Sequence, residues 1–183
     1  MSDKEIKALG IDVSATTVYK NESYIFGCQE ELSNEKPMRI LFVSTDNVCR
    51  SPMAQAYVNH IGQGKGVFAQ SAGLYPKYGQ PIEDKAVNAL VERGIFPCPS
   101  NPFTNHTASS VTLEMIESSS VIVGMTESHA LALIRSYPQA AQRIISFPKD
   151  IAEPTGKNDA GYDLVLSEII QGVHSLFSCL NDE

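Results

Sequence analysis

The chain has 183 residues, of which 43% are hydrophobic and 19% are charged. This balance excludes collagen, coiled coils and general disorder, and it allows one domain with a sizeable core. A net charge of −7, from 14 basic against 21 acidic residues, argues against binding to nucleic acid or to an anionic membrane.

The first 37 residues differ from the rest of the chain. They are mostly polar, and Ile25-Phe26 is their only strong apolar pair. We therefore expect residues 1–37 to form a poorly ordered N-terminal extension and residues 38–183 to form a single domain.

From Met38 onward, short apolar stretches suited to buried strands alternate with amphipathic segments suited to helices. We expect Ser51 to cap the first of these helices, because it precedes a proline that suits a first helical position. This alternation predicts an α/β fold, a three-layer sandwich with a four-stranded parallel sheet flanked by helices. The expected strands are 39–43, 66–70, 120–125 and 143–147, and the expected helices are 52–60, 81–93, 109–118, 127–136 and a final one through 165–180.

Four cysteines lie far apart and form no Cys-x-x-Cys pair. This usage favours reduced thiols in a cytoplasmic protein over a disulfide scaffold or a zinc site. The apolar runs are too short to cross a membrane. We expect no metal and no cofactor.

The loop after the first strand reads Ser44-Thr45-Asp46-Asn47-Val48-Cys49-Arg50-Ser51-Pro52. In a parallel sheet, ligands bind beyond the carboxyl ends of the strands, often on a loop that opens a helix. Successive backbone N–H groups in such a loop form a nest for a tetrahedral anion. Arg50 adds a planar fork that binds two phosphate oxygens. The pattern predicts a phosphate-binding loop over residues 44–51.

This loop, with Leu41-Phe42-Val43 before it and Met53-Ala54 after it, strongly resembles the phosphate loop of low-molecular-weight protein tyrosine phosphatases. The segments Ser71-Ala72-Gly73, His106-Thr107-Ala108-Ser109 and Glu153-Pro154 follow in the order of the family's motifs, so the resemblance covers about residues 38–180. It implies hydrolysis of a phosphomonoester through a phosphocysteine intermediate, with phosphotyrosine-containing proteins or peptides and inorganic phosphate as partners.

The resemblance also implies roles for the loop residues. Asn47 would hold the loop in shape through hydrogen bonds to Ser51, Ser71 and His106. The phosphate would be bound by the loop residues Thr45, Asp46, Asn47, Val48, Cys49, Arg50 and Ser51.

At the nucleophile position the family has cysteine and this chain has Ser44. A thiol in such a loop is ionised near neutral pH, whereas a serine hydroxyl needs an adjacent base, and the loop supplies none. Cys49 stands beside Arg50 and not at the base of the loop, so it is no obvious substitute. We expect phosphate binding with very little turnover. Ser44 is then either an engineered replacement of the nucleophile or the mark of a natural pseudophosphatase that binds phosphotyrosine.

Two further positions depart from the family. Glu153 stands where the general acid is aspartate, and we assign it that role, with Asp150 and Asp159 as alternatives. Asp46 stands where glycine is usual. We expect it to tolerate a left-handed backbone and to point its carboxylate away from the phosphate.

The substrate preference depends on Val48, because an apolar side chain suits the face of a phenyl ring. We therefore favour phosphotyrosine and expect Tyr75 or Tyr78 to form the pocket wall. The alternative is phosphoarginine, since the chain resembles the bacterial protein-arginine phosphatases around Met125-Thr126 and His129, although that branch carries threonine at the position of Val48.

Overall fold

The computed structural model describes residues 37–154, 156 and 158–181. Apart from residue 37, the expected N-terminal extension lies outside the described residues.

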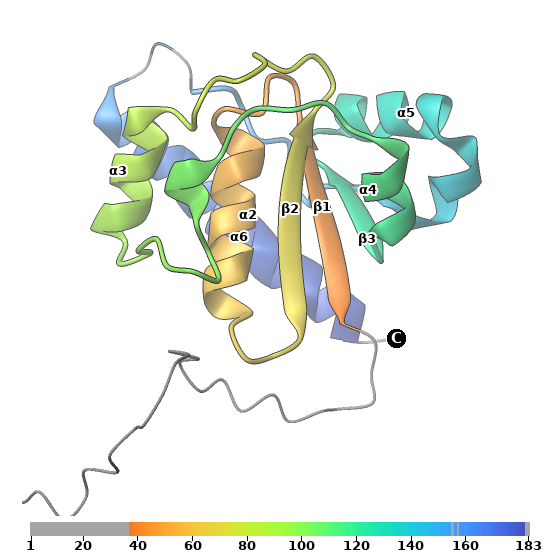
Figure 1. Cartoon of the computed structure of the whole chain (residues 1–183), viewed down its shortest axis with the longest axis horizontal. Coiled ribbons are helices and arrows are strands. Elements are labelled where there is room, and N and C mark those ends of the chain that lie inside the picture. Colours follow the sequence, from red (N-terminus) through yellow and green to blue (C-terminus); the bar gives the residue numbers. More distant parts are fainter. Residues whose placement is uncertain (1–36, 155, 157, 182–183) are drawn as a thin grey trace, which may run out of the picture. The chain divides into compact units, whose positions relative to one another are not determined.

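Four parallel strands form one sheet at the centre of the fold (Figure 1). Its order is β2-β1-β3-β4, with both neighbours of β1 aligned parallel to it. This confirms the predicted four-stranded parallel sheet. The strands are β1 (Met38–Ser44), β2 (Val67–Gly73), β3 (Val121–Gly124) and β4 (Ile144–Ser146).

Helices cover both faces of the sheet (Figure 1). Successive residues of β1 point to opposite faces, and its residues from Ile40 to Ser44 are fully buried. Ile40 and Phe42 join the core under α2, α3 and α6, whereas Leu41 and Val43 join the core under α4 and α5. Burial on both faces explains why this strand reads as an unbroken apolar run. The helices are α2 (Arg50–Ile61), α3 (Asp84–Glu92), α4 (Leu113–Ser118), α5 (Glu127–Ser136) and α6 (Asp159–Asn181).

Several predicted boundaries were wrong. Strand β2 continues to Gly73 because its last three residues still pair with β1. Helix α3 begins at Asp84, since Glu83 before it is extended. Helix α4 begins only at Leu113, where the hydroxyl of Thr112 caps it by accepting from the N–H of Met115.

The predicted N-cap of α2 was also wrong. The helix begins at Arg50, with Cys49 in the cap position and no side-chain cap hydrogen bond. Ser51 therefore lies inside the first turn. Its hydroxyl bonds instead to Ser44 and Asn47 in the preceding loop.

Helix α6 packs so closely on Phe147 that it requires glycine at position 172. A Cβ on Gly172 would lie 2.0 Å from Cε1 of Phe147, which is itself 2% exposed. We expect Gly172→Ala to lower the free energy of unfolding by about 1–3 kcal/mol through overpacking, although alanine favours helix by about 1 kcal/mol. Urea unfolding measures the change. Ser175→Ala, at an exposed position of the same helix, is the control and should change stability by less than about 0.5 kcal/mol. An unchanged Gly172→Ala variant would contradict this packing.

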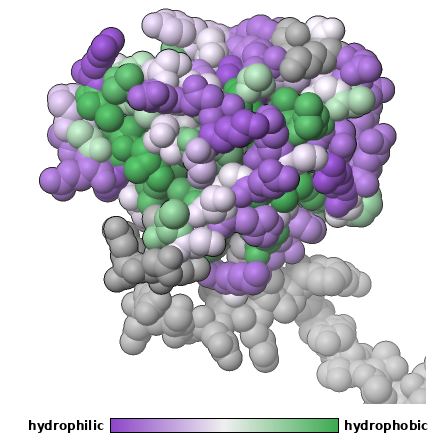
Figure 2. Space-filling view, turned by 180° about the vertical axis from the view of Figure 1, so that it is seen from behind, coloured by the Kyte–Doolittle hydropathy of each residue, from purple (hydrophilic) through white to green (hydrophobic). Residues whose placement is uncertain are grey.

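Polar side chains cover much of the face that lies behind the view of Figure 1. Seen from behind, polar side chains surround separate apolar patches (Figure 2). Among the described residues, no helix combines the length and the apolar character that a membrane crossing requires.

Candidate functional site

The candidate loop, residues 44–51, connects the carboxyl end of β1 to the start of α2. β1 lies between β2 and β3, so the strand order reverses beside β1. The carboxyl ends of the strands at such a reversal are the usual place for a ligand in parallel sheets, and the loop emerges there. The segment after β2 lies against it: Leu74 N–H donates to Ser44 O at 2.9 Å and Tyr75 N–H to Thr45 O at 2.8 Å. Gly73 permits this approach, because a Cβ there would lie 2.9 Å from Thr45 O.

Asn47 ties the loop to β2 and to the segment of residues 106–109. Its Nδ2 donates to Ser51 Oγ and Ser71 Oγ, both at 3.0 Å, and its Oδ1 accepts from Ser109 N–H at 3.1 Å. His106 Nε2 lies 2.8 Å from the backbone carbonyl of Asn47 and must donate there. The structure thus brings Asn47, Ser51, Ser71 and His106 together, with His106 bonded to the backbone of Asn47.

The left-handed residue of the loop is Asn47, with φ of 60°, and not Asp46 as the sequence suggested. Asparagine adopts this conformation more readily than most residues. The carboxylate of Asp46 is directed to Lys77, with 3.2 Å between Oδ2 and Nζ. Lys77 lies in the loop after β2 and is half exposed.

The backbone N–H groups of residues 45–51 donate to no acceptor within the described part of the chain. Most of these residues are nevertheless buried, from Asn47 at 0% to Arg50 at 5% exposed. Buried N–H groups in proteins almost always have an acceptor. A run of N–H donors without one, at the N-terminus of a helix, is therefore typical of a loop that binds an anion.

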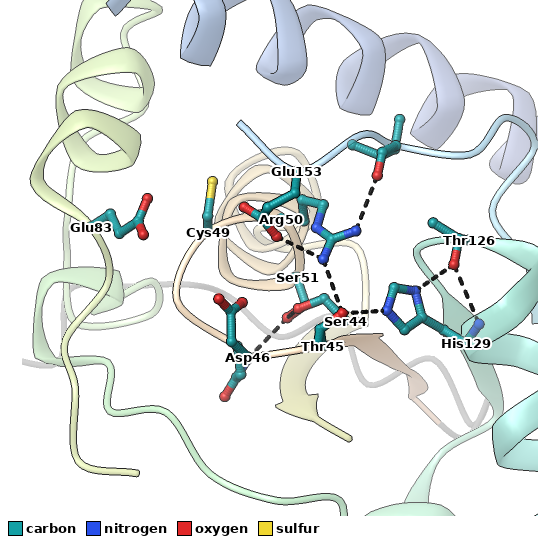
Figure 3. A network of polar contacts seen from close by, with 12 residues as sticks. Ser44, Thr45, Asp46, Cys49, Arg50, Ser51, Glu83, Thr126, His129 and Glu153 are labelled. Carbon is teal, nitrogen blue, oxygen red and sulfur yellow. Dashed lines mark hydrogen bonds and ion pairs between the residues drawn. The ribbon is translucent and has the colours of Figure 1, made fainter. Parts of the chain in front are cut away.

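Arg50 lies at the centre of the site (Figure 3). Its Nη1 donates to the carbonyl of Ile151 at 3.2 Å, and its Nη2 donates to Thr45 Oγ1 at 3.2 Å. Nη2 also pairs with Glu153 Oε2 at 2.6 Å. The Nε–H of Arg50 is buried and has no acceptor among the described residues. One donor of the guanidinium fork is therefore available for an anion.

Ser44 lies at the end of β1 and is fully buried. Its hydroxyl is 2.8 Å from the hydroxyl of Ser51. Among the described residues, no histidine or carboxylate is hydrogen bonded to the Ser44 hydroxyl. The hydroxyl therefore has no general base in contact with it.

Cys49 is not a substitute nucleophile. Burial, followed by the negative charges of Glu153 and Glu83, raises the pKa of its thiol far above neutral, and Arg50 opposes this only in part. The thiol lies 3.6 Å from the sulfur of Met53. It is thus protonated at pH 7 and directed into the core.

The three acids considered from the sequence lie in different places. Glu153 contacts Arg50. Asp150 accepts a hydrogen bond from the N–H of Glu127 at 2.8 Å, and Asp159 lies at the start of α6, with a 79% exposed side chain 3.8 Å from Lys85. Only Glu153 among these three contacts a residue of the loop.

A hollow of about 310 Å³ lies beside the loop, and its walls are not the expected tyrosines. Tyr75 and Tyr78 are 79% and 72% exposed and do not line it. Its lining residues come from the loop and from the segment before α3: Val48, Lys77, Gln80, Pro81, Ile82, Glu83 and Asp84.

Sequence reasoning missed Glu83 and Tyr162. The hydroxyl of Tyr162 donates to Glu83 Oε2 at 2.6 Å, so the carboxylate is held at the hollow. Burial and the bond to Glu83 raise the pKa of Tyr162, which therefore stays a donor. The two residues are 79 positions apart, and no spacing rule connects them.

His129, on α5, was also missed as a site residue. Its Nε2 lies 2.9 Å from Thr45 Oγ1 and its Nδ1 lies 2.7 Å from Thr126 Oγ1 (Figure 3). The only signal in the sequence was the resemblance around residues 125–129. The described residues contain no group of three or more side chains arranged to hold a metal ion.

The chain is similar in sequence to known and probable protein phosphatases. A protein-arginine-phosphatase of Geobacillus stearothermophilus is 32% identical over 127 residues, which cover 66% of this chain and 80% of the relative. A probable low molecular weight protein-tyrosine-phosphatase EpsP of Ralstonia nicotianae is 28% identical over 138 residues, covering 73% of this chain and 90% of the relative.

Among solved structures, a serine variant of the YwlE arginine phosphatase with a phosphorylated active-site serine superposes with a TM-score of 0.70 at 28% identity. The match covers 80% of this chain and 97% of that one. The family model for low molecular weight phosphotyrosine protein phosphatases matches residues 39–183, from the first strand through the last helix. With the sheet, the loop and this match in agreement, the chain belongs to the low molecular weight phosphotyrosine protein phosphatase family, whose members include phosphatases of tyrosine and of arginine.

Proposed function

We propose that this chain captures phosphorylated side chains of proteins in the loop 44–51 and, with Ser44 at the nucleophile position, releases phosphate very slowly. The observation that carries this proposal is the buried Nε–H of Arg50, which has no acceptor among the described residues. It lies in the same loop as the unpaired backbone donors of residues 45–51. A phosphoryl group supplies the several acceptors that these donors need.

Slow turnover follows from the chemistry of a hydroxyl. An unactivated serine is a weak nucleophile, and its alkoxide is a far poorer leaving group than a thiolate. The serine variant of the arginine phosphatase carries a phosphorylated active-site serine. By analogy, a phosphoryl group that reaches Ser44 would remain there, and intact mass would show one added phosphoryl group after incubation with substrate.

Phosphotyrosine is the substrate class that we favour. Val48 and Ile82 are 2% and 3% exposed, and both line the hollow beside the loop. A phenyl ring bound there would contact two apolar side chains while its phosphate reached Arg50.

Phosphoarginine is a second candidate, because Glu83 places a carboxylate at the same hollow. A carboxylate binds a guanidinium group through charge-assisted hydrogen bonds. The protein-arginine-phosphatase of Geobacillus stearothermophilus supports this candidate by its 32% identity.

Peptides of one sequence that carry phosphotyrosine, phosphoarginine or no phosphate separate these possibilities in a fluorescence anisotropy titration. We expect the phosphotyrosine peptide to bind most tightly. Glu83→Gln should weaken binding of the phosphoarginine peptide about tenfold, because a charged hydrogen bond is lost, and should change binding of the phosphotyrosine peptide much less. Glu114→Gln, at an exposed position of α4, is the matched control.

The titration distinguishes a change of substrate class from a failure of the proposed function. Tighter binding of the phosphoarginine peptide, with its loss in Glu83→Gln, would transfer the assignment to the second candidate. Binding that does not depend on phosphate in any peptide would contradict the proposed function itself.

The proposed partners are therefore phosphorylated proteins and inorganic phosphate, with neither nucleic acid nor membrane among them. The charge of −7 supports the exclusion of nucleic acid. A cytoplasmic location is also part of this proposal, and the wide spacing of the four cysteines supports it.

A further inference from the structure

Arg50 is held by a chain of side-chain hydrogen bonds that begins on α5 (Figure 3). Thr126 contacts His129 at 2.7 Å, His129 contacts Thr45 at 2.9 Å, and Thr45 accepts from Arg50 Nη2 at 3.2 Å. Cys49 and Glu83 lie on the opposite side of Arg50. The chain of hydrogen bonds thus runs from α5 to the guanidinium group that would bind phosphate.

The direction of each hydrogen bond follows from the number of hydrogens. The single hydrogen of the Thr45 hydroxyl points away from Arg50, because its oxygen accepts there. His129 Nε2 can receive it, since a lone pair beside the arginine cation is more favourable than an N–H. The hydrogen of the ring then lies on Nδ1 and is donated to Thr126, whose own hydroxyl is 2.8 Å from Ser128 Oγ.

This arrangement requires a neutral imidazole. Burial and the charge of Arg50 lower the pKa of His129 to about 4, while Asp150 and Asp46 oppose the shift. His129 is 6% exposed, so the ring is a fixed acceptor at pH 7.

We propose that His129 is a positioning residue that acts through Thr45 to aim the Arg50 guanidinium at the phosphoryl group. Among the described residues, the side chain of His129 is hydrogen bonded to Thr45 and Thr126 and not to Ser44. Its whole effect passes through the Thr45 hydroxyl. This inference rests on the proposed function, because it assigns a task to Arg50 within it.

The relay is the chain of hydrogen bonds from Thr126 through His129 and Thr45 to Arg50. Isothermal titration of the full chain with inorganic phosphate tests this relay without any need for turnover. Thr45→Val keeps the shape of the side chain and removes the hydroxyl, and we expect it to weaken phosphate binding about tenfold. His129→Asn keeps an amide near the position of Nδ1 but loses the contact to Thr45, and a smaller loss is expected. His129→Gln can place an amide oxygen near the position of Nε2 and should restore binding to within about twofold of the original chain.

The double variant separates positioning from a general structural effect. If His129 acts only through Thr45, adding His129→Asn to Thr45→Val causes no further loss. Losses that multiply in the double variant, or His129→Asn binding as tightly as the original chain, would overturn the inference. Thermal unfolding of each variant shows whether the fold is retained.

Arg50→Lys serves as the control for the site, since lysine cannot replace a planar fork. If the original chain binds no phosphate, or if Arg50→Lys binds as tightly, the proposed function fails independently of the relay. The NMR resonance of the buried Arg50 Nε–H then still tests the relay without phosphate. We expect it to shift in His129→Asn and to return in His129→Gln, and an unchanged resonance in His129→Asn would contradict the inference.

Discussion

Replacing Ser44 by cysteine is expected to raise the rate of aryl phosphate hydrolysis by at least about 10³-fold, the scale on which loss of a nucleophile acts in other enzymes. A thiol at this position would lie next to Ser51, in the first turn of α2, and a helix N-terminus and a nearby arginine each lower the pKa of a cysteine. The hydroxyl of Ser44 has only the hydroxyl of Ser51 as its hydrogen-bond partner among the described side chains. Steady-state kinetics of the two chains, measured side by side, gives the comparison.

Two further variants control this result. Ser44→Ala has no nucleophile, and Ser44→Cys combined with Cys49→Ala retains only the introduced one. We expect the first to be inactive and the second to keep most of the activity, because the thiol of Cys49 is protonated and buried. If Ser44→Cys binds phosphate and still does not hydrolyse the substrate, more than the nucleophile is missing, and the chain is a pseudophosphatase.

Glu153→Gln should have opposite effects on turnover and on phosphate binding. We expect from the sequence that Glu153 is the proton donor, so its replacement in the Ser44→Cys background should lower kcat by about 10²-fold or more. Inorganic phosphate should bind about tenfold more tightly, because a carboxylate 2.6 Å from Arg50 competes with the anion for the guanidinium. Kinetics with an aryl phosphate and titration with phosphate measure the two effects.

Asp150→Asn and Asp159→Asn are the matched controls for Glu153. Neither acid contacts Arg50: Asp150 bonds to the backbone of Glu127, and Asp159 is largely exposed. Both variants should therefore retain kcat. A loss of kcat in either one, with normal turnover in Glu153→Gln, would move the role of proton donor to that residue.

The sheet could be predicted because its two inner strands, β1 and β3, are largely buried and read as continuous apolar runs. Helix ends were harder to predict. Ser51 suited an N-cap by residue type, but its hydroxyl bonds to Ser44 and Asn47, and the helix begins two residues earlier than expected, at Arg50. Tertiary contacts in the loop outweighed the local capping preference.

Some contacts of the candidate site could likewise be predicted from the sequence, and others could not. The contacts of Asn47 with Ser51, Ser71 and His106 could be predicted because the resemblance to the family carried these partners, whereas its bond to the N–H of Ser109 was not predicted. Glu83, Tyr162 and His129 could not, since each approaches the loop from a distant part of the chain. Their positions follow from the packing of α3, α5 and α6, which no local spacing encodes.

The proposed function requires residues 44–51 to form a working phosphate loop with Ser44 at the nucleophile position. A titration of the unaltered chain with inorganic phosphate, followed by the backbone amide resonances of a ¹⁵N-labelled sample, tests this requirement. We expect saturable shifts that are largest for the amides of residues 45–51, with a parallel shift of the Arg50 Nε–H. If the amides of the loop do not respond to phosphate, or if the shifts are confined to another part of the chain, residues 44–51 are not a phosphate-binding loop.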